Sequence, residues 1–379
     1  MLDLESLYKR HASVFAGAMR YALEQSWDSI IDEYVDDTLP TQVGKPIPYD
    51  GIIARATNEL ALRANRLKIP LVNIWLSSPV CTSLPGVFPD YAAAGIMRAE
   101  HLLARGYRRF AGLISDNNRA HELENEAFIS SVNSAGCPCI SEVIPLHTSD
   151  TVKKWRKTEQ AIAAFMDKWV LPIGVFVGND MNGRIVAQMC RTRGWRVPQD
   201  VAIITGSNEE LICEHIRPTL SSVEFGYERV GYEAARLLNR LMDGESAPTE
   251  ALLLAPTGVI ARESTDFFAV DNKLISTALE FIAAHSHLQI GADDVAKAVN
   301  TQTRTLQRHF HNYLKRPIAT EIRNVRIERA KQELTQSNHT LAQIAKDVGF
   351  GQAMRMYEVF RRELGITPNQ YRKERQEPK

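Results

Sequence analysis

Short runs of almost continuously apolar residues recur between positions 51 and 205 of the chain. Strands that are covered on both faces of a parallel sheet have this pattern, whereas strands with one solvent-exposed face alternate apolar and polar positions. Five such runs predict buried strands: 51–54, 71–75, 110–114, 174–177 and 201–205.

Segments with the helical spacing of apolar residues separate these runs and follow them. They are 91–105, 120–135, 152–168, 182–193 and 227–242. Alternating strands and helices predict parallel sheets built from β-α-β units. The units are too numerous for one small sheet, so we expect two sheets with a cleft between them. Clefts at the carboxyl ends of strands bind small ligands.

The pattern becomes wholly helical after residue 262. An amphipathic helix is expected over 274–285, and two further segments, 295–310 and 344–360, repeat one plan. Each has a short helix with an apolar face, a tight turn, and a second helix with basic and amide side chains. Asn300 and Gly349 occupy the turns, and both residue types tolerate the left-handed conformation. The plan is that of a helix-turn-helix unit, whose second helix fits the major groove of DNA.

One long helix, 317–337, is predicted between the two units. About 20 residues rise roughly 30 Å in a helix, and one turn of DNA is about 34 Å. The helix therefore has the length to hold two DNA-reading units in successive major grooves. Arg323, Arg326 and Arg329 recur along it and suit either phosphate contacts or salt bridges with Glu328 and Glu333. We favour the salt bridges.

The second helix of each unit is expected to bury one apolar stripe and to present its other side to DNA. Leu306 and Phe310 would anchor the first of these helices, and Met356 and Phe360 the second. The DNA-binding candidates are Thr303, Arg304, Gln307, Arg308, Gln352, Met354, Arg355 and Glu358. Arginine can bond guanine, glutamine can bond adenine, and glutamate can accept from cytosine although it repels phosphate.

The formal net charge of zero hides an uneven distribution. Residues 272–379 hold 18 of the 45 Lys and Arg residues and 11 of the 45 Asp and Glu residues, a balance of +7, so the preceding residues carry −7. A basic domain favours a polyanion, and an acidic body discourages nonspecific adhesion to it. The charge pattern therefore supports nucleic acid as the partner of the tail.

Cysteine usage and missing motifs narrow the class of protein. Five cysteines, two of them separated only by Pro138, fit neither a disulfide framework nor a metal-binding spacing. No secretory signal begins the chain, and no apolar run approaches the ~20 residues that span a bilayer, so we predict a cytoplasmic protein without membrane contact. No catalytic or phosphate-binding motif is visible, so we expect no enzyme, no cofactor and no metal.

Several stretches of the first 262 residues together resemble the LacI-type sensor fold, which is shared with periplasmic sugar-binding proteins. They are 88–95 (FPDYAAAG), 99–107 (AEHLLARGY), 178–180 (GND), 194–201 (GWRVPQDV) and 218–243. The resemblance implies an α/β, type I periplasmic-binding-protein-like domain with parallel sheets over residues 1–262. Its two lobes would close on a ligand, and the chain would cross between them near residues 115, 222 and 250.

A linker at 263–272 and an all-α domain with two helix-turn-helix motifs at 273–379 would follow. The family begins with a full apolar strand, whereas only four residues precede Glu5 here. We therefore expect that the natural start lies upstream or that this lobe is weakened.

Polar and aromatic residues near strand ends are candidates for the ligand site: Tyr8, Arg10, Trp75, Asn179, Asp180, Asn208 and Glu209. In the resembling family the aspartate at the position of Asp180 reaches sugar hydroxyls, because a carboxylate can accept two hydrogen bonds from a diol. Simpler roles stay open, namely helix capping by Asn179 and Asp180, a surface ion pair for Arg10, and core packing for Trp75. The family often has an aspartate where Ser207 stands, and we expect an arginine near the place of Glu124. The missing aspartate at Ser207 leaves the chemical class of the ligand open.

Roughly the last hundred residues closely resemble the AraC-type DNA-binding domain. The matching stretches are 305–310 (TLQRHF), 326–330 (RIERA), 344–350 (IAKDVGF), 359–363 (VFRRE) and 367–372 (TPNQYR). A LacI-type sensor ahead of an AraC-type reader resembles regulators of the XylR group. The resemblance implies a homodimeric, ligand-responsive transcription regulator that binds double-stranded promoter DNA and acts on RNA polymerase. It would activate genes for catabolism of a xylose-like pentose; the alternative is a repressor or a regulator that responds to a non-sugar molecule.

Overall fold

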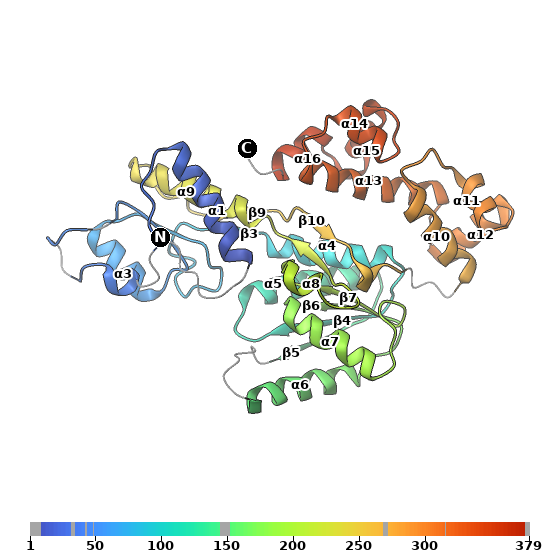
Figure 1. Ribbon diagram of the computed structural model, residues 1–379, viewed down its shortest axis with the longest axis horizontal. Helices are drawn as coiled ribbons and strands as arrows, with labels where there is room; N and C mark the ends of the chain where they lie inside the picture. Colours follow the sequence, from blue (N-terminus) through green and yellow to red (C-terminus); the bar gives the residue numbers. More distant parts are fainter. Residues whose placement is uncertain are drawn as a thin grey trace.

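The computed structural model describes residues 9–31, 35–41, 44–47, 49–144, 152–267, 272–314 and 316–375. Within them the chain forms an α/β body, here called the sensor (9–267), and a helical domain, here called the reader (272–375) (Figure 1). A two-lobed α/β body followed by an all-helical domain confirms the predicted fold class. None of the helices within these ranges combines the length and the apolar character that crossing a membrane requires.

The first lobe contains small parallel sheets covered by helices. β1 (Ile52–Ala54) pairs with β2 (Leu71–Asn73), and β3 (Val87–Pro89) pairs with β9 (Leu252–Leu254). Its helices are α1 (Lys9–Glu24), α2 (Val35–Thr38), α3 (Asn58–Leu67) and α9 (Tyr227–Met242). The backbones of α1 and α9 touch, because a Cβ added to Gly17 or Gly231 would lie 1.8 Å from a carbonyl oxygen of the other helix.

The second lobe is a six-stranded sheet in the order β10-β8-β7-β6-β4-β5. Its strands are β4 (Phe110–Ser115), β5 (Cys139–Ile144), β6 (Ile173–Val177), β7 (Val201–Thr205), β8 (Ser221–Glu224) and β10 (Gly258–Ile260). They run parallel, except that β10 is antiparallel to β8. Every residue of β4, β6 and β7 is buried, as their apolar runs predict.

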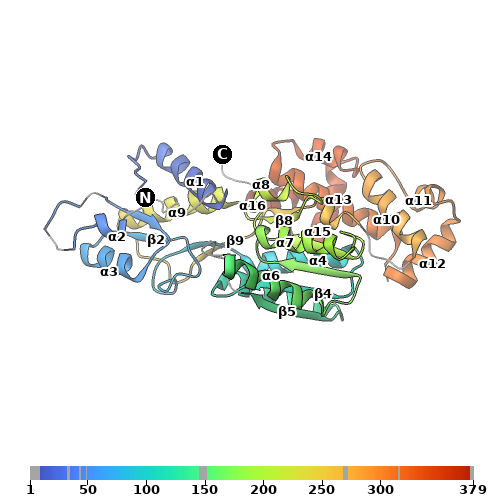
Figure 2. The same cartoon turned by 60° about the horizontal axis from the view of Figure 1, so that its bottom comes forward.

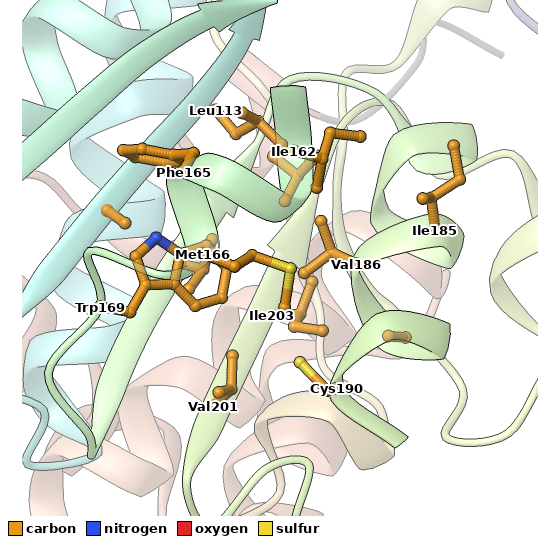
Figure 3. Close-up of a cluster of buried hydrophobic side chains, with 14 of the residues drawn as sticks. Leu113, Ile162, Phe165, Met166, Trp169, Ile185, Val186, Cys190, Val201 and Ile203 are labelled. Atoms are coloured by element: carbon orange, nitrogen blue, oxygen red, sulfur yellow. The ribbon is translucent and has the colours of Figure 1, made fainter. Parts of the chain in front are cut away.

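Helices cover both faces of this sheet (Figure 2). α4 (Tyr91–Ala104) and α5 (Arg119–Ser134) pack on one face, and α6 (Val152–Met166) and α7 (Asp180–Thr192) on the other. Figure 3 shows the core under α6 and α7, where Phe165 and Trp169 meet edge to face at 5.9 Å between ring centroids. Cys190 lies in the same core, and burial raises the pKa of its thiol to about 12. All five cysteines are free thiols.

The chain crosses between the lobes at three places, and the first prediction of a crossing, near residue 115, is wrong. β3 pairs with β9 in the first lobe, whereas β4 pairs with β5 and β6 in the second, so the first crossing lies at Asp90, between β3 and α4. The other crossings fall between β8 and α9 and between β9 and β10, close to the predicted positions 222 and 250. Local patterns do not reveal strand partners distant in sequence, so the sequence places the first crossing after the helix 91–105 when it in fact lies before it.

The start of the predicted linker, 263–272, is folded into the sensor. Residues Glu263–Thr265 form the short helix η1, in which Ser264 and Thr265 are fully buried. The Ser264 hydroxyl donates to the Ile203 carbonyl at 2.6 Å, and the Thr265 and Ser221 hydroxyls lie 2.7 Å apart. The sensor therefore extends at least to Thr265, and part of the predicted linker, 268–271, lies outside the described residues.

The reader consists of two small helical cores joined by one helix. Its elements are α10 (Lys273–His285), α11 (Ala292–Ala298), α12 (Thr303–Leu314), α13 (Ile318–Gln336), α14 (Leu341–Asp347), α15 (Ala353–Leu364) and α16 (Pro368–Arg375). Ile318 and Ile322 at the start of α13 belong to the first core, and Ile327 and Leu334 further along belong to the second. The 19 residues of α13 rise about 28 Å, so α13 is the connecting helix that the sequence predicts.

Candidate nucleic-acid interface and effector site

The first helix-turn-helix unit, α11 and α12, has the predicted turn and the predicted buried stripe. Asn300 adopts the left-handed conformation with φ of 53°. Leu306 and Phe310 are fully buried, and Arg304, Gln307 and Arg308 are exposed on the opposite side of α12. Thr303 is half-buried, and its hydroxyl donates to Asp293 of α11 at 2.6 Å. The exposed amide and guanidinium groups can reach base edges, whereas the Thr303 hydroxyl joins the two helices.

The second unit, α14 and α15, follows the same plan. Gly349 has φ of 94°, and a Cβ there would lie 2.3 Å from the Ser286 carbonyl oxygen, so glycine is required twice over. Met356 and Phe360 are buried. The predicted outward residues, Gln352, Met354, Arg355 and Glu358, are all exposed, with Met354 at 67%. The two recognition helices therefore both present side chains to solvent.

The arginines of α13 hold the two units in register, but not through the predicted salt bridges. Arg326 donates to the carbonyls of Ser286 and Leu288 at 2.8 and 2.7 Å, and Arg329 donates to Ala283 at 2.6 Å. The expected partners bond elsewhere, because Glu328 pairs with Lys331 at 2.7 Å and Glu333 lies 3.5 Å from His339. The carbonyls at the end of α10 face α13, so they take the guanidinium donors instead.

A further bond links the loop after α10 to the second turn, since the Gln289 amide donates to the Gly349 carbonyl at 3.2 Å. Burial lowers the pKa of Arg326, and the neighbouring Arg355 lowers it further. Arg323 pairs with Glu363 of α15 at 3.1 Å. Through these contacts one helix fixes the orientation of both units.

The candidate ligand residues of the second lobe gather at the carboxyl ends of β6 and β7. Asn179 caps α7 by accepting from the Asn182 amide at 2.7 Å, and its side chain donates to Ser115 at 3.4 Å. Asp180 is 2% exposed and accepts from Thr205, Ser222, Ser207 and Glu209 at 2.5 to 3.3 Å. Protein donors thus already use the acceptor positions of Asp180, and this carboxylate shapes the loop after β7.

Asn208 and Glu209 continue this network toward the first lobe. Asn208 has φ of 56°, donates to Glu224 at 2.8 Å and accepts from Arg262 at 2.7 Å. The Glu209 carboxylate accepts from the backbone N–H of Lys9 at 3.0 Å, which joins the loop to the start of α1. Glu209 therefore connects the lobes directly, and Asn208 does so only through Glu224, which pairs with Lys9 of α1 at 2.7 Å.

Arg10 and Trp75 approach from the first lobe, and Tyr8 lies outside the described residues. Burial raises the pKa values of Tyr91 and Tyr227 and lowers that of His121, and the positive charge of Arg10 is a smaller, lowering influence on all three. Trp75 is half-buried, and the Arg55 guanidinium lies 4.8 Å from its ring centroid. Arg10 therefore lies near a group of aromatic and acidic side chains between the lobes.

The sequence does not single out the ion pair at the centre of this group. Arg98 of α4 is fully buried, donates to the Thr205 and Gly206 carbonyls at 3.2 and 2.7 Å, and lies 3.4 Å from a carboxylate oxygen of Glu124. An arginine is expected near the place of Glu124, and the structure supplies one, Arg98, from α4. The only sequence signal is an arginine on the otherwise small and apolar face of that helix.

Glu124 and His121 carry hydrogen-bonding capacity that the described residues leave unused. Oε2 of Glu124 and Nδ1 of His121 are buried and make no hydrogen bond within the described chain. Burial raises the pKa of Glu124 to about 7, against the opposing charge of Arg98. Burial, with Arg98 and Arg10, lowers the pKa of His121 to about 4, so its ring is neutral at pH 7. Both atoms could accept hydrogen bonds from the hydroxyl groups of a ligand.

A separate cavity of about 390 Å³ lies in the first lobe between α1, α9 and the start of β1. Its walls include Phe15, Trp27, Tyr49, Leu238 and Met242. None of the described candidate ligand residues lines it. It is therefore distinct from the site between the lobes.

Comparison with known proteins divides the chain in the same way. Residues 99–265 match the family described as periplasmic binding protein-like domain, and residues 295–374 match a helix-turn-helix domain. The xylose operon regulatory protein of Haemophilus influenzae is 25% identical over 98% of this chain and 97% of its own length. The protein of the same name from Escherichia coli K12 is 26% identical over 98% and 95%.

Solved structures show the same architecture. The xylose-binding transcription activator XylR matches with a TM-score of 0.60 at 24% identity and covers 99% of this chain and 98% of its own. The sensor alone is similar to a CelR–cellobiose complex, with a TM-score of 0.55 at 20% identity over 68% of this chain and 79% of that one. A LacI-family regulator from Enterococcus faecium with bound ribose gives a TM-score of 0.56 at 18% identity, over 69% and 97%.

Proposed function

We propose that this chain, a homologue of the xylose operon regulatory proteins with a periplasmic-binding-protein-like sensor and a helix-turn-helix reader, couples a small polyhydroxylated effector to sequence-specific DNA binding. One observation carries the proposal. In one chain, Glu124 and His121 offer buried atoms without hydrogen bonds between the two lobes of the sensor. The same chain carries two exposed recognition helices, α12 and α15, which the helix α13 connects. It is a transcription regulator by homology, because the similar proteins are named as xylose operon regulatory proteins.

The reader is proposed to bind double-stranded DNA through both units. Arg304 and Arg308 can form paired hydrogen bonds with guanine, and Gln307 and Gln352 with adenine. Met354 offers an apolar contact, and Glu358 can accept from cytosine. The helix α12 carries no acidic residue, whereas α15 carries Glu358, which repels phosphate. This difference favours tighter DNA binding by the first unit.

The effector is proposed to be a sugar, with a xylose-like pentose as the first choice. The names of the similar proteins mention xylose, cellobiose and ribose. Arg10 can donate to ring or hydroxyl oxygens, and Glu124 and His121 can accept from hydroxyl protons. Trp75 can stack on the apolar face of a sugar ring. Asp180, Asn179, Asn208 and Glu209 would shape the loop that surrounds the ligand.

A non-sugar effector is the second candidate, favoured by two specific positions. Ser207 stands where an aspartate is frequent in the resembling family, and Glu124 stands where we expected an arginine. Glu124 exchanges a donor for an acceptor, whereas Ser207 exchanges an acceptor for a hydroxyl that also donates, and both changes alter which ligand substituents can be bound. A ligand that offers a donor to Glu124 and an acceptor to Ser207 would suit this pair.

Regulation is proposed to be activation by a homodimer that contacts RNA polymerase in the cytoplasm, with repression as the alternative. Effector binding can shift the sensor between open and closed forms only if its affinity for the two forms differs. Closure would then change how two readers lie on neighbouring DNA sites.

A thermal-shift screen of pentoses, hexoses and uronic acids tests the effector. A ligand at 100 times its dissociation constant should stabilise the sensor by about 2.7 kcal/mol. DNA selected in vitro from a random library then reports the reader, with affinity measured at one stated salt concentration with and without the active sugar. Operator binding without any response to these compounds would reject the sugar effector and leave the DNA-binding function standing.

A further inference from the structure

One helix of the sensor, α4, contacts the reader as well as the site between the lobes. Figure 1 shows α13 of the reader running alongside α4 of the sensor. Arg316, just before α13, donates to the carbonyl of Ala104 at 3.3 Å, and Ala104 is the last residue of α4. Arg98, six residues earlier on α4, donates to carbonyls at the end of β7 and in the loop after it.

A buried carboxylate lies between charges from the two domains. Glu321 of α13 is 3% exposed, and its oxygen lies 2.6 Å from Nε of Arg316. Burial raises the pKa of Glu321, while Arg316 and then Arg105 of the sensor oppose that rise. Burial lowers the pKa of Arg105 to about 10, so its guanidinium group is charged at neutral pH. Glu321 therefore pairs with Arg316, which itself donates to the end of α4, and the charge of Arg105 acts on the same carboxylate from the sensor.

Arg105 also fixes the chain where it leaves the sensor. Its Nε donates to the Thr265 carbonyl at 2.6 Å, and His101, one turn earlier on α4, lies 2.8 Å from the Thr265 hydroxyl. The end of α4 thus binds Thr265, near the end of the sensor, and also contacts Arg316 just before α13. Further along, the charge of Lys331 lowers the pKa of Glu100, whose burial raises it.

The contact between the domains is polar. Among the described residues, no hydrophobic cluster contains side chains from both the sensor and the reader. Polar interfaces between domains resemble transient protein–protein interfaces, and their contacts can exchange. Docking without shared apolar packing depends on the few charges that meet there.

We propose that Glu321, Arg316 and Arg105 form a docking clamp that fixes the reader to α4 and hence to the second lobe. Because the clamp lies on the second lobe, the reader moves with that lobe when the lobes close. Arg304, Arg308, Met354 and Glu358 stay exposed in the docked arrangement, so the clamp orients the recognition helices and does not cover them. The clamp supplies the physical link that effector control of DNA binding requires.

Substituting Glu321→Gln tests the clamp, because it removes the charge and keeps the size of the side chain. Arg316 then loses the carboxylate that holds it beside the end of α4, and Arg105 loses an opposing charge, so the reader should undock. Small-angle scattering of the full-length protein, without DNA or sugar, should show a larger radius of gyration and a broader distance distribution. Glu333→Gln on the same helix is the matched control, because Glu333 contacts His339 within the reader, and its profile should match that of the parent.

Arg316→Gln and Arg105→Gln approach the same contact from each domain. Either one should expand the protein as Glu321→Gln does, and combining Glu321→Gln with either should expand it little further, since the contact is already lost. Circular dichroism melts identify any variant that fails to fold, and the Arg316 variant then decides, because its side chain is 27% exposed. Unchanged scattering for all three folded variants, or equal expansion of the Glu333 control, would overturn the clamp.

A second test measures DNA binding of the clamp variants with and without sugar. This test depends on the proposed function, whereas the scattering experiment does not. With an operator selected in vitro and the sugar found by thermal shift, clamp variants should bind DNA within about threefold of the parent but lose most of the response to sugar. A folded, undocked variant that keeps the full response would show that the clamp does not carry the signal. If no sugar acts on the parent, the proposed effector fails while the scattering result still decides the clamp.

Discussion

Glu124 shows how burial changes the chemistry of a single carboxyl group. It is 2% exposed, and its pKa rises to about 7 although Arg98 lies 3.4 Å away. The folded protein therefore retains a proton that the unfolded chain releases above its ordinary pKa near 4.5. The contribution of Glu124 to the free energy of unfolding is therefore largest below pH 4.5. It falls as the pH rises toward about 7 and does not change further above pH 7.

Replacing Glu124 by glutamine should abolish this part of the pH dependence. The free energy of unfolding of the parent, relative to the variant, should fall between about pH 4.5 and 7 by up to about 3 kcal/mol. Urea unfolding at several pH values measures the difference. Glu122→Gln on the same helix is the control, because Glu122 is partly exposed and pairs with Arg119 at the surface. If the free energies of unfolding of the parent and the Glu124 variant change in parallel with pH, the carboxyl group with the raised pKa is not Glu124.

Arg308 is the residue at which base reading can be separated from general attraction to DNA. It is exposed on the recognition face of α12. Arg308→Ala should cost about 1–3 kcal/mol at a cognate guanine and relax specificity at that base pair. Lys297 lies on the exposed side of α11. Any loss of DNA affinity caused by Lys297→Ala should be the same for all operator sequences. Competition binding against single-base operator variants distinguishes the two, and an even loss for Arg308→Ala would assign it to phosphate.

Helices were easier to predict than their partners. The bounds of α9 and the turns at Asn300 and Gly349 follow from spacing of apolar residues and from backbone preference, which are local properties. The first lobe crossing depends on β3 pairing with β9, which lies far along the chain. The partners of Arg326 and Arg98 are backbone carbonyls of other elements. Carbonyls carry no sequence signature, so those contacts could not be foreseen.

The helix α13 should set the spacing of the two DNA-reading units through Arg326. Its two bonds to Ser286 and Leu288 fasten the loop after α10 to α13. Arg326→Gln should loosen the first unit relative to the second, so that operators with one inserted base pair between the two half-sites bind almost as well as the parent operator. The unaltered protein should discriminate strongly between them. Melting curves must accompany this comparison. A variant with an unfolded reader would lose all DNA binding, whereas a folded but loosened reader would still bind DNA and lose only its preference for spacing.

At the scale of the whole molecule, the sensor and the reader have different electrostatic tasks. The residues from 272 onward carry a balance of +7 and the preceding ones −7, so the DNA should meet the reader while the sensor stays clear of it. Two recognition helices separated by a strut of about 28 Å correspond to neighbouring major grooves on one face of a duplex.

A footprint of the protein on an operator selected in vitro should therefore show two protected patches per subunit, about one helical turn apart on the same face. The patch under the first unit should be the more strongly protected, because Arg304 and Arg308 have no acidic neighbour on α12, whereas α15 carries Glu358. Glu358→Gln removes repulsion from phosphate and should strengthen protection of the second patch at low salt, where exposed charges act furthest. A single patch per subunit in both proteins would mean that only one unit enters a groove, and the strut would then have a role other than spacing.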